Sequence, residues 1–270
     1  MPIDNQQLEQ LKQIARDAGQ AIMQVYRREE FGVRSKEDDS PLTEADLAAH
    51  RVIEAGLAAL TPEIPRLSEE AAAIPFEQRR NWQRFWCIDP LDGTKEFIRR
   101  NDEFTVNIAL IEQGAPLLGL IYVPPTGTLY WGGRELGAWK QRDGQPPRAI
   151  HCRPLGEILT VIASRRHGED RNATLLAGIA DQFNGIDTTN IGSSLKMCLI
   201  AEGKADVYPR LFPTSEWDTA AAQAIVEAAG GRLVDAERLE PLRYNQRESL
   251  ENPWFLVIGD PAFPLNQLDY

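Results

Sequence analysis

Apolar residues recur at helical spacing along the N-terminal part of the chain. Residues 5–26 carry them on one side of a helical wheel, which predicts an amphipathic helix with one buried face. A second helix is predicted over residues 43–60, where Thr43 and Asp46 form a capping-box pattern. Ser40-Pro41 marks the loop between the two helices. The apolar positions of the first helix are Leu8, Leu11, Ile14, Ala15, Ala18 and Ile22.

A meander of β-strands is predicted over residues 104–140. Apolar residues alternate or run continuously there, and they are interrupted by Gly114, Pro124-Pro125 and Gly132-Gly133. Before the meander, short strands are predicted at residues 65–68 and 84–88. Beyond it, strand and helix patterns alternate. The later strands are predicted at residues 159–164, 186–191, 205–208, 231–234 and 254–258, and the later helices at residues 170–183, 194–202 and 218–229.

These patterns predict an α/β protein with two different halves. We expect residues 1–148 to form an α+β half, in which helices cover an antiparallel sheet, and residues 149–270 to form an α/β half. The polar segment 141–148, which contains Gly and Pro, marks the boundary. A length of 270 residues suits one large domain, or two halves that pack as one unit.

The net charge and the lengths of the apolar runs argue against some classes of function. A formal charge of −11 without a cluster of Lys and Arg argues against nucleic-acid binding. It permits a small anionic substrate if cations lie between substrate and protein. No apolar run approaches the ~20 residues of a membrane helix, and the N-terminus lacks the pattern of a secretion signal. We therefore expect a cytoplasmic protein with no integral membrane segment; peripheral association with the inner membrane is left open.

Cysteine and histidine usage indicates what kind of metal the chain can bind. The three cysteines have no CxxC spacing, which suits buried thiols in a reducing compartment rather than disulfides or a zinc site. The three histidines are widely separated. Any bound metal should therefore be a hard cation held by oxygen atoms.

The string WCIDPLDGT at residues 86–94 is the most informative motif. An apolar strand leads directly into Asp89 and Asp92. Pro90 fixes one backbone dihedral between the two aspartates, and Gly93 allows a tight turn after them. The two carboxylates can converge on one point, where their repulsion demands a cation. The Leu91 carbonyl is a candidate for a further oxygen ligand. The alternative interpretation is a strand end with two solvated turn aspartates.

Two other acidic spots fit the same purpose. Glu69 and Glu70 follow a short predicted strand, although such a pair is commonly only a solvated edge. Asp218 stands at the start of the helix predicted at residues 218–229, where the simplest alternative is a helix N-cap. The hypothesis of a metal site depends on the three spots together.

Four strings resemble motifs of the inositol monophosphatase-like superfamily, and they occur along the chain in the same order as in that superfamily. They are DDSPLTEAD at residues 38–46, SEE at 68–70, DPLDGT at 89–94 and EWDTAA at 216–221, within a resemblance that runs from about residue 8 to past residue 231. The resemblance implies a layered α/β/α/β/α sandwich. Small departures, Leu42 where Val is usual and residues 211–213 where a Gly-Pro pair is common, touch no proposed ligand.

Finer features are similar to one branch of the superfamily, the bacterial 3′(2′),5′-bisphosphate nucleotidases. These features are the strings KEF at residues 95–97, GSSLK at 192–196 and YPR at 208–210. The branch implies a Mg²⁺-dependent, Li⁺-sensitive phosphatase that removes the 3′-phosphate of adenosine 3′,5′-bisphosphate, leaving AMP. Its partner would be a small nucleotide, with no nucleic acid.

The resemblance also implies roles for individual residues. Two Mg²⁺ ions would lie at the site, one on Glu69, Asp89 and the Leu91 carbonyl, and the second on Asp89, Asp92 and Asp218. A third, weaker ion near Glu69 and Glu70 is left open. Such ions neutralise the phosphate, generate hydroxide near neutral pH and stabilise the leaving oxygen, so water attacks without a covalent intermediate.

Asp38 and Thr94 are implied as the catalytic pair, with Asp38 accepting a proton from the attacking water through the Thr94 hydroxyl. Without the resemblance, Asp38 can be read as the start of a turn, and Asp39 is the alternative if the register is off by one. No Cys or His is placed by the sequence to serve as a nucleophile.

Substrate contacts are implied on both sides of the metal ligands. The implied set is Glu69, Leu91, Asp92, Gly93, Thr94, Gly192, Ser193, Ser194, Lys196 and Asp218. Arg165 and Arg166 are candidates for contact with the second phosphate. Two alternatives stay open: an inositol or sugar phosphate monophosphatase of the same fold, and a non-catalytic regulator that binds metal and anion.

Overall fold

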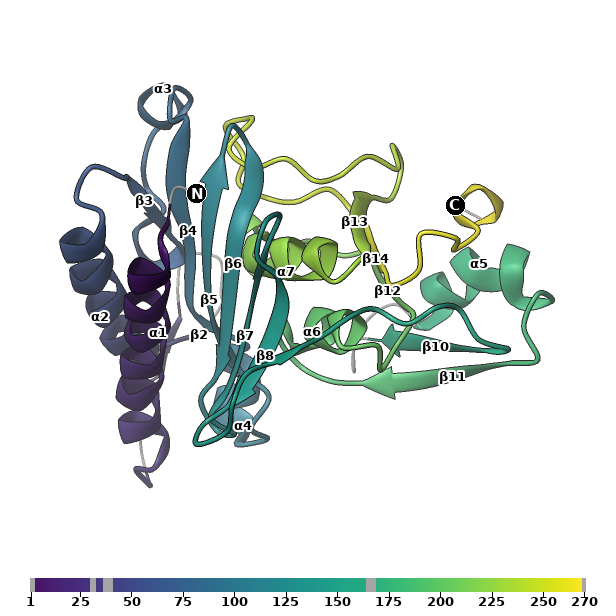
Figure 1. Cartoon of the computed structure of the whole chain (residues 1–270), viewed down its shortest axis with the longest axis horizontal. Helices are drawn as coiled ribbons and strands as arrows, with labels where there is room; N and C mark the ends of the chain where they lie inside the picture. Colours follow the sequence, from purple (N-terminus) through teal and green to yellow (C-terminus); the bar gives the residue numbers. More distant parts are fainter. Residues whose placement is uncertain (1–2, 30–32, 36–40, 164–168, 269–270) are drawn as a thin grey trace.

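Two large β-sheets and three layers of helix alternate along the length of the molecule (Figure 1), beside a small two-stranded sheet of β1 (Val33–Ser35) and β2 (Pro41–Thr43). The structure is a computed structural model, and it describes residues 3–29, 33–35, 41–163 and 169–268. Helices α1 (Asn5–Tyr26) and α2 (Glu44–Leu60) form the first layer, and a seven-stranded sheet forms the second. Helices α6 (Leu195–Ala201) and α7 (Glu216–Ala228) form the third layer, a five-stranded sheet the fourth and α5 (Glu169–Ala180) the fifth. The predicted α/β class and the layered α/β/α/β/α sandwich are confirmed.

The seven-stranded sheet contains the predicted meander. Its strands are joined in sequence order, and every neighbouring pair is antiparallel except the first, β3 and β4, which is parallel. The sheet is therefore mixed, where the sequence predicted an antiparallel one. The strands are β3 (Arg66–Ser68), β4 (Arg84–Asp92), β5 (Thr105–Glu112), β6 (Ala115–Val123), β7 (Thr128–Gly133), β8 (Gly137–Arg142) and β9 (Arg148–Ala149).

Each of the two helices in the first layer has an N-terminus capped by a side chain. Helix α1 (Asn5–Tyr26) has the predicted bounds and is capped by Asp4. Helix α2 (Glu44–Leu60) follows Thr43, whose backbone N–H donates to Asp46 Oδ2 at 2.8 Å, as the capping-box pattern predicted. The two helices pack on each other and on one face of the seven-stranded sheet.

The central strands are buried on both faces. Along β4, Phe85 and Cys87 lie in the cluster beside α6 and α7, whereas Trp86 and Ile88 lie in the cluster beside α1 and α2. Successive side chains of a strand point to opposite faces, so a strand covered on both sides reads as a continuous apolar run. Because β4 is packed on both faces, the acidic motif that follows Ile88 is held in a fixed position.

The five-stranded sheet lies between α6 and α7 on one side and α5 (Glu169–Ala180) on the other. Its strand order is β11-β10-β12-β14-β13, with parallel pairing of β10 to β11 and β12, and antiparallel pairing of β14 to its neighbours. The strands are β10 (Ile158–Ala163), β11 (Gly185–Asn190), β12 (Val207–Arg210), β13 (Arg232–Asp235) and β14 (Phe255–Ile258).

The remaining elements are short, apart from the two helices of the third layer. These helices are α6 (Leu195–Ala201) and α7 (Glu216–Ala228). The short elements are β1 (Val33–Ser35), β2 (Pro41–Thr43), η1 (Glu69–Ala71), α3 (Phe76–Arg79), α4 (Thr94–Arg99) and η2 (Leu265–Gln267). Among the described residues, no helix combines the length and the apolar character needed to cross a membrane. The division of the chain at residue 148 stays a prediction.

Helix α7 approaches the seven-stranded sheet unusually closely. Its inward face consists largely of alanine, and at Gly119 of β6 an added Cβ would lie 2.0 Å from the backbone oxygen of Ala221. At Gly132 of β7 an added Cβ would lie 3.0 Å from the Cα of Ile225. Glycine in the strands and alanine in the helix therefore set how close α7 and the sheet can come.

We predict that Gly119→Ala destabilises the protein by about 1–3 kcal/mol, because the added methyl group overlaps the backbone of α7. Urea unfolding measures the change in the free energy of unfolding. Gly156→Ala is the matched control, since nothing lies within 4 Å of a Cβ at that position; its effect should be about 1 kcal/mol or less. Equal stabilities of the two variants would contradict the packing argument.

Candidate active site

A β-bulge in β4 brings Asp89 and Asp92 together. Asp89 is paired with Asn107 and Asp92 with Thr105, so β4 contains one residue more than β5 between the two pairs. The sequence predicted that the strand ends at residue 88, but β4 continues to Asp92 through the bulge. Pro90 has no N–H to donate to the ladder, which suits the irregular position.

The turn after the bulge requires glycine. Gly93 has a φ of 91°, and an added Cβ would lie 3.1 Å from the backbone oxygen of Glu103. Helix α4 begins at the next residue, Thr94. The backbone N–H of Leu91 donates to Asp89 Oδ1 at 3.0 Å, so the carboxylate also stabilises its own bulge.

Thr94 has a carboxylate partner that the sequence did not indicate. Its hydroxyl lies 3.2 Å from Asp46 Oδ1 and 3.3 Å from the carbonyl oxygen of Leu91. Asp46 is buried, and its other oxygen accepts from the N–H and the hydroxyl of Thr43. One carboxylate therefore caps α2 and also holds Thr94. The capping-box pattern accounted for Asp46 fully, so nothing in the sequence indicated this second contact.

Several predicted residues lie outside the part of the chain that the structure describes. They are Asp38, Asp39, Arg165 and Arg166. The pairing of Asp38 with Thr94, and contact of the two arginines with a second phosphate, stay predictions.

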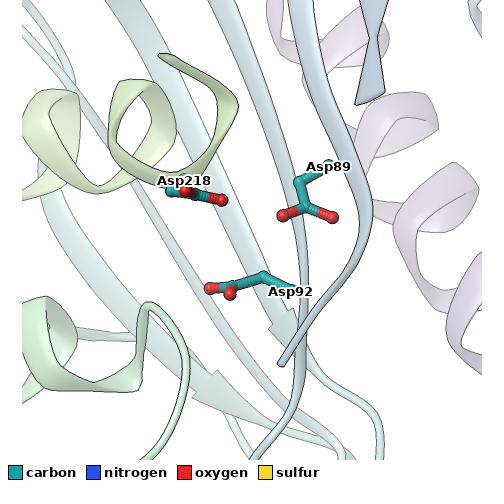
Figure 2. Close-up of side chains that lie close together, drawn as sticks. All are labelled: Asp89, Asp92 and Asp218. Atoms are coloured by element: carbon teal, nitrogen blue, oxygen red, sulfur yellow. The ribbon is translucent and has the colours of Figure 1, made fainter. Parts of the chain in front are cut away.

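Asp218 occupies the third position of α7 rather than its N-cap. The cap is Ser215, whose backbone N–H donates to Asp218 Oδ2 at 2.7 Å in a second capping box. The N-cap interpretation of Asp218 is therefore wrong, and the helix begins two residues before the predicted start. Figure 2 shows the Asp218 carboxylate directed toward Asp89 and Asp92.

The three aspartates form one compact acidic cluster. One oxygen from each of Asp89, Asp92 and Asp218 lies within 4.8 Å of the others (Figure 2). Burial, together with the charges of Glu69 and Asp92, raises the pKa of Asp89 well above its usual value. Burial and the charge of Asp92 raise the pKa of Asp218 to about 7. Close carboxylate oxygens with raised pKa values, one buried and two half-buried, are the donor set that suits a hard divalent cation.

Glu69 borders this cluster. It follows β3 at the start of η1, and the parallel pairing of Ser68 with Ile88 places that end of β3 beside the end of β4. A hydrogen bond and the charge of Glu69 both raise the pKa of Asp89. Glu69 and Glu70 are both half-buried, which differs from the freely solvated edge considered as the alternative.

The loop before α6 is tied to the acidic cluster. The backbone N–H of Ser194 donates to Asp92 Oδ2 at 2.5 Å, and the buried Ser194 hydroxyl donates to Asn107 Oδ1 at 2.8 Å. The N–H of Gly192 donates to Glu103 Oε2 at 2.7 Å. The predicted contacts of Gly192, Ser193 and Ser194 with a substrate stay predictions, and the side chain of Ser194 is already engaged within the protein.

Two cationic side chains lie near the cluster. Lys196 is 8% exposed, and burial lowers its pKa to about 8 despite the neighbouring charge of Asp92. The positive charge of Arg210, at the end of β12, lowers the pKa values of both Lys196 and Asp218. The Nε of Arg210 is buried and has no hydrogen-bond partner among the residues that the structure describes. Arg210 belongs to the YPR string, but no individual role was predicted for it.

Zones of opposite charge therefore meet at this site. The aspartates can bind a divalent cation, while Lys196 and Arg210 can bind an anionic group beside it. A phosphate ester with a second negative group would match both zones.

Comparison with known proteins agrees with this geometry. The family model described as the inositol monophosphatase family matches residues 4–256. The 3′(2′),5′-bisphosphate nucleotidase CysQ of Salmonella typhimurium is 52% identical over 251 residues, which cover 93% of this chain and 98% of that protein. The protein of the same name from Escherichia coli K12 is 50% identical over the same shares of the two chains.

Solved structures share the fold. The crystal structure of CysQ from Bacteroides thetaiotaomicron, at 40% identity, superposes with a TM-score of 0.80 and covers 94% of this chain and 97% of that one. The suhB protein of Bartonella henselae, at 25% identity, superposes with a TM-score of 0.77 over 96% of each chain. The chain belongs to the inositol monophosphatase family.

Proposed function

We propose that this chain is a Mg²⁺-dependent 3′(2′),5′-bisphosphate nucleotidase that hydrolyses the 3′-phosphate of adenosine 3′,5′-bisphosphate to AMP and phosphate. The observation that carries the proposal is the meeting of two charge zones, the three aspartates and the pair Lys196 and Arg210. A bisphosphate needs a place for the reacting phosphate and a second place for the phosphate that stays. The CysQ relatives at about 50% identity support the same substrate class.

The acidic zone would hold two Mg²⁺ ions. Glu69, Asp89 and the Leu91 carbonyl would bind one, and Asp89, Asp92 and Asp218 the other; these oxygen donors match the preference of Mg²⁺ for few carboxylates and several waters. When bound, the ions supply neutralisation of the phosphate, activation of water and stabilisation of the leaving oxygen. The raised pKa values of Asp89 and Asp218 support this assignment, since added positive charge would relieve their repulsion.

Thr94 would orient the attacking water. Its hydroxyl lies within reach of Asp46 and of the Leu91 carbonyl, so the side chain is held at the end of the bulge, next to the aspartates. Asp46 would accept a hydrogen bond from the Thr94 hydroxyl, and the hydroxyl oxygen would accept one from the water; as the water attacks, its proton would pass to Thr94 and the Thr94 proton to Asp46. The predicted role of Asp38 as this proton acceptor stays a prediction, since Asp38 lies outside the described residues.

The cationic zone would bind the 5′-phosphate. Lys196 is buried and directed by its contact with the Ser193 carbonyl oxygen at 3.3 Å, while Arg210 holds a buried Nε that lacks an acceptor among the described residues. An unpaired buried donor costs about 1–3 kcal/mol, so a phosphate oxygen at Arg210 would recover that energy. Charge-assisted hydrogen bonds of this kind are stronger than neutral ones.

We predict phosphate release from adenosine 3′,5′-bisphosphate in preference to inositol 1-phosphate, because only the first substrate occupies both charge zones. The two substrates are compared side by side with Mg²⁺, and release should stop in excess EDTA and return with added Mg²⁺. Preference for the inositol ester would replace the proposed substrate with a polyol phosphate. Persistent release in EDTA would contradict the metal mechanism.

We predict that Asp92→Asn lowers kcat by about 1,000-fold or more, because loss of a ligand of the second metal ion removes several kcal/mol of charge stabilisation. The measurement is kcat at saturating Mg²⁺, with circular dichroism to verify the fold. Asp181→Asn, which changes an exposed aspartate after α5, is the matched control and should retain full activity. Full activity of the Asp92→Asn protein would show that Asp92 is not a required metal ligand, whereas absence of turnover in the wild type as well would favour the non-catalytic regulator.

We predict that Arg210→Met lowers kcat/KM for adenosine 3′,5′-bisphosphate at least about tenfold more than for adenosine 3′-phosphate. Only the bisphosphate carries the group that Arg210 would bind. Arg232→Met removes an exposed arginine from β13 and should change neither value. Equal losses for both substrates would place the 5′-phosphate elsewhere.

A further inference from the structure

A completely buried arginine lies outside the acidic cluster. Arg79, at the end of α3, is 1% exposed. Its Nε donates to the Ile74 carbonyl oxygen at 3.2 Å, and its Nη1 donates to Asn245 Oδ1 at 2.6 Å and to the Arg247 carbonyl oxygen at 3.1 Å. Its Nη2 donates to the carbonyl oxygen of Glu248. Burial of a guanidinium group is costly unless its donors are paired, and here all three nitrogens are.

Asn245 relays this contact to the start of α7. Its side-chain Nδ2 donates back to the Arg79 carbonyl oxygen at 2.7 Å, so the two residues are joined in both directions. Its backbone N–H donates to both carboxylate oxygens of Glu216, each at 2.9 Å. Asn245 is 5% exposed and Glu216 is 4% exposed. Asn245 has a φ of 57°, a left-handed conformation that asparagine tolerates better than most residues.

This network joins two segments that carry members of the acidic site. Arg79 belongs to the stretch that begins with η1, whose first residue is Glu69. Glu216 is the first residue of α7 and lies two positions before Asp218. The loop that contains Asn245 and Leu250 also contacts α7 through its backbone, because the N–H of Glu216 donates to the Leu250 carbonyl oxygen at 2.9 Å.

The acidic site requires such a connection. Asp218 comes from α7, whereas Glu69 and Asp89 come from the seven-stranded sheet and its edge, so their mutual repulsion pushes two separate elements apart. A cation can bridge them only if their spacing is already correct. Residues that orient metal ligands from behind are the known means of setting this spacing.

We propose that Arg79 is a positioning residue for the metal site: through Asn245 and Glu216 it holds Asp218 at a spacing from Glu69 and Asp89 that a divalent cation can bridge. The inference rests on the proposed metal-dependent function. The planar guanidinium group is essential to it, because one side chain must reach an amide oxygen and three carbonyl oxygens in different directions.

The test is direct binding of Mn²⁺, a hard cation with similar ligand preferences, measured as the loss of the free Mn²⁺ signal in electron paramagnetic resonance. Arg79→Lys and Arg79→Met should bind Mn²⁺ about 10- to 100-fold more weakly than the wild type. Arg79→Lys keeps the charge but lacks the fork, so it supplies the measurement if Arg79→Met does not fold. Thermal unfolding sets a temperature at which every variant is folded.

Arg153→Met is the matched control. Arg153 donates three side-chain hydrogen bonds, two to Asp206 at 2.7 Å, directly before β12, and one to Thr160 of β10 at 2.8 Å. Its loss should lower the melting temperature and leave Mn²⁺ affinity unchanged. A change in Mn²⁺ affinity equal to that of Arg79→Met would show that the effect is general loss of stability and would overturn the inference.

A second variant tests the relay. Asn245→Ala should weaken Mn²⁺ binding, and the double variant Arg79→Met/Asn245→Ala should bind no more weakly than the worse single variant, because the residues act in series. Wild-type affinity in both Arg79→Lys and Asn245→Ala would overturn the inference while the proposed function stands. Failure of the wild type to bind Mn²⁺ would instead overturn the proposed function.

Discussion

Repulsion among carboxylates is the constraint on which this structure depends. Asp89, Asp92 and Asp218 place oxygens within 4.8 Å of one another, and two unit charges at that distance repel by about 3 kcal/mol at an effective dielectric constant of 20. The bulge in β4, the capping of α7 by Ser215 and the glycine-alanine contact between β6 and α7 each hold one part of this arrangement. Favourable packing and hydrogen bonds elsewhere in the fold therefore offset the repulsion between these carboxylates.

Features that are local in the sequence could be predicted. The bounds of α1 follow from helical periodicity, because the helix buries one face along its whole length. Asp89 and Asp92 could be recognised together since only two residues separate them. Asp218 is distant in the chain; it was a candidate by residue type, and the resemblance to a family motif assigned it to the same metal ion as the other two. The bulge could not be predicted from β4, because it is defined by the count of residues on the partner strand.

Contacts that depend on tertiary packing left no sign in the sequence. Asp46 has a complete local explanation as a capping residue, yet it also accepts from Thr94, which lies far along the chain. Arg79 stands in a polar stretch that is typical of a protein surface, yet it is among the most completely buried side chains. A single sequence does not say which charged residue the fold will cover, because that depends on loops that return from distant positions.

The two charge zones are supplied by different elements of the fold, and this separation affects how enzymes of this architecture can change their substrate. The acidic residues come from the seven-stranded sheet and α7, whereas Lys196 comes from α6 and Arg210 from the five-stranded sheet. If Lys196 and Arg210 bind the second phosphate as proposed, substitutions in this group change which ester is accepted while the hydrolytic centre stays intact. An ancestral phosphatase of this architecture could acquire new substrates by small steps without passing through an inactive form.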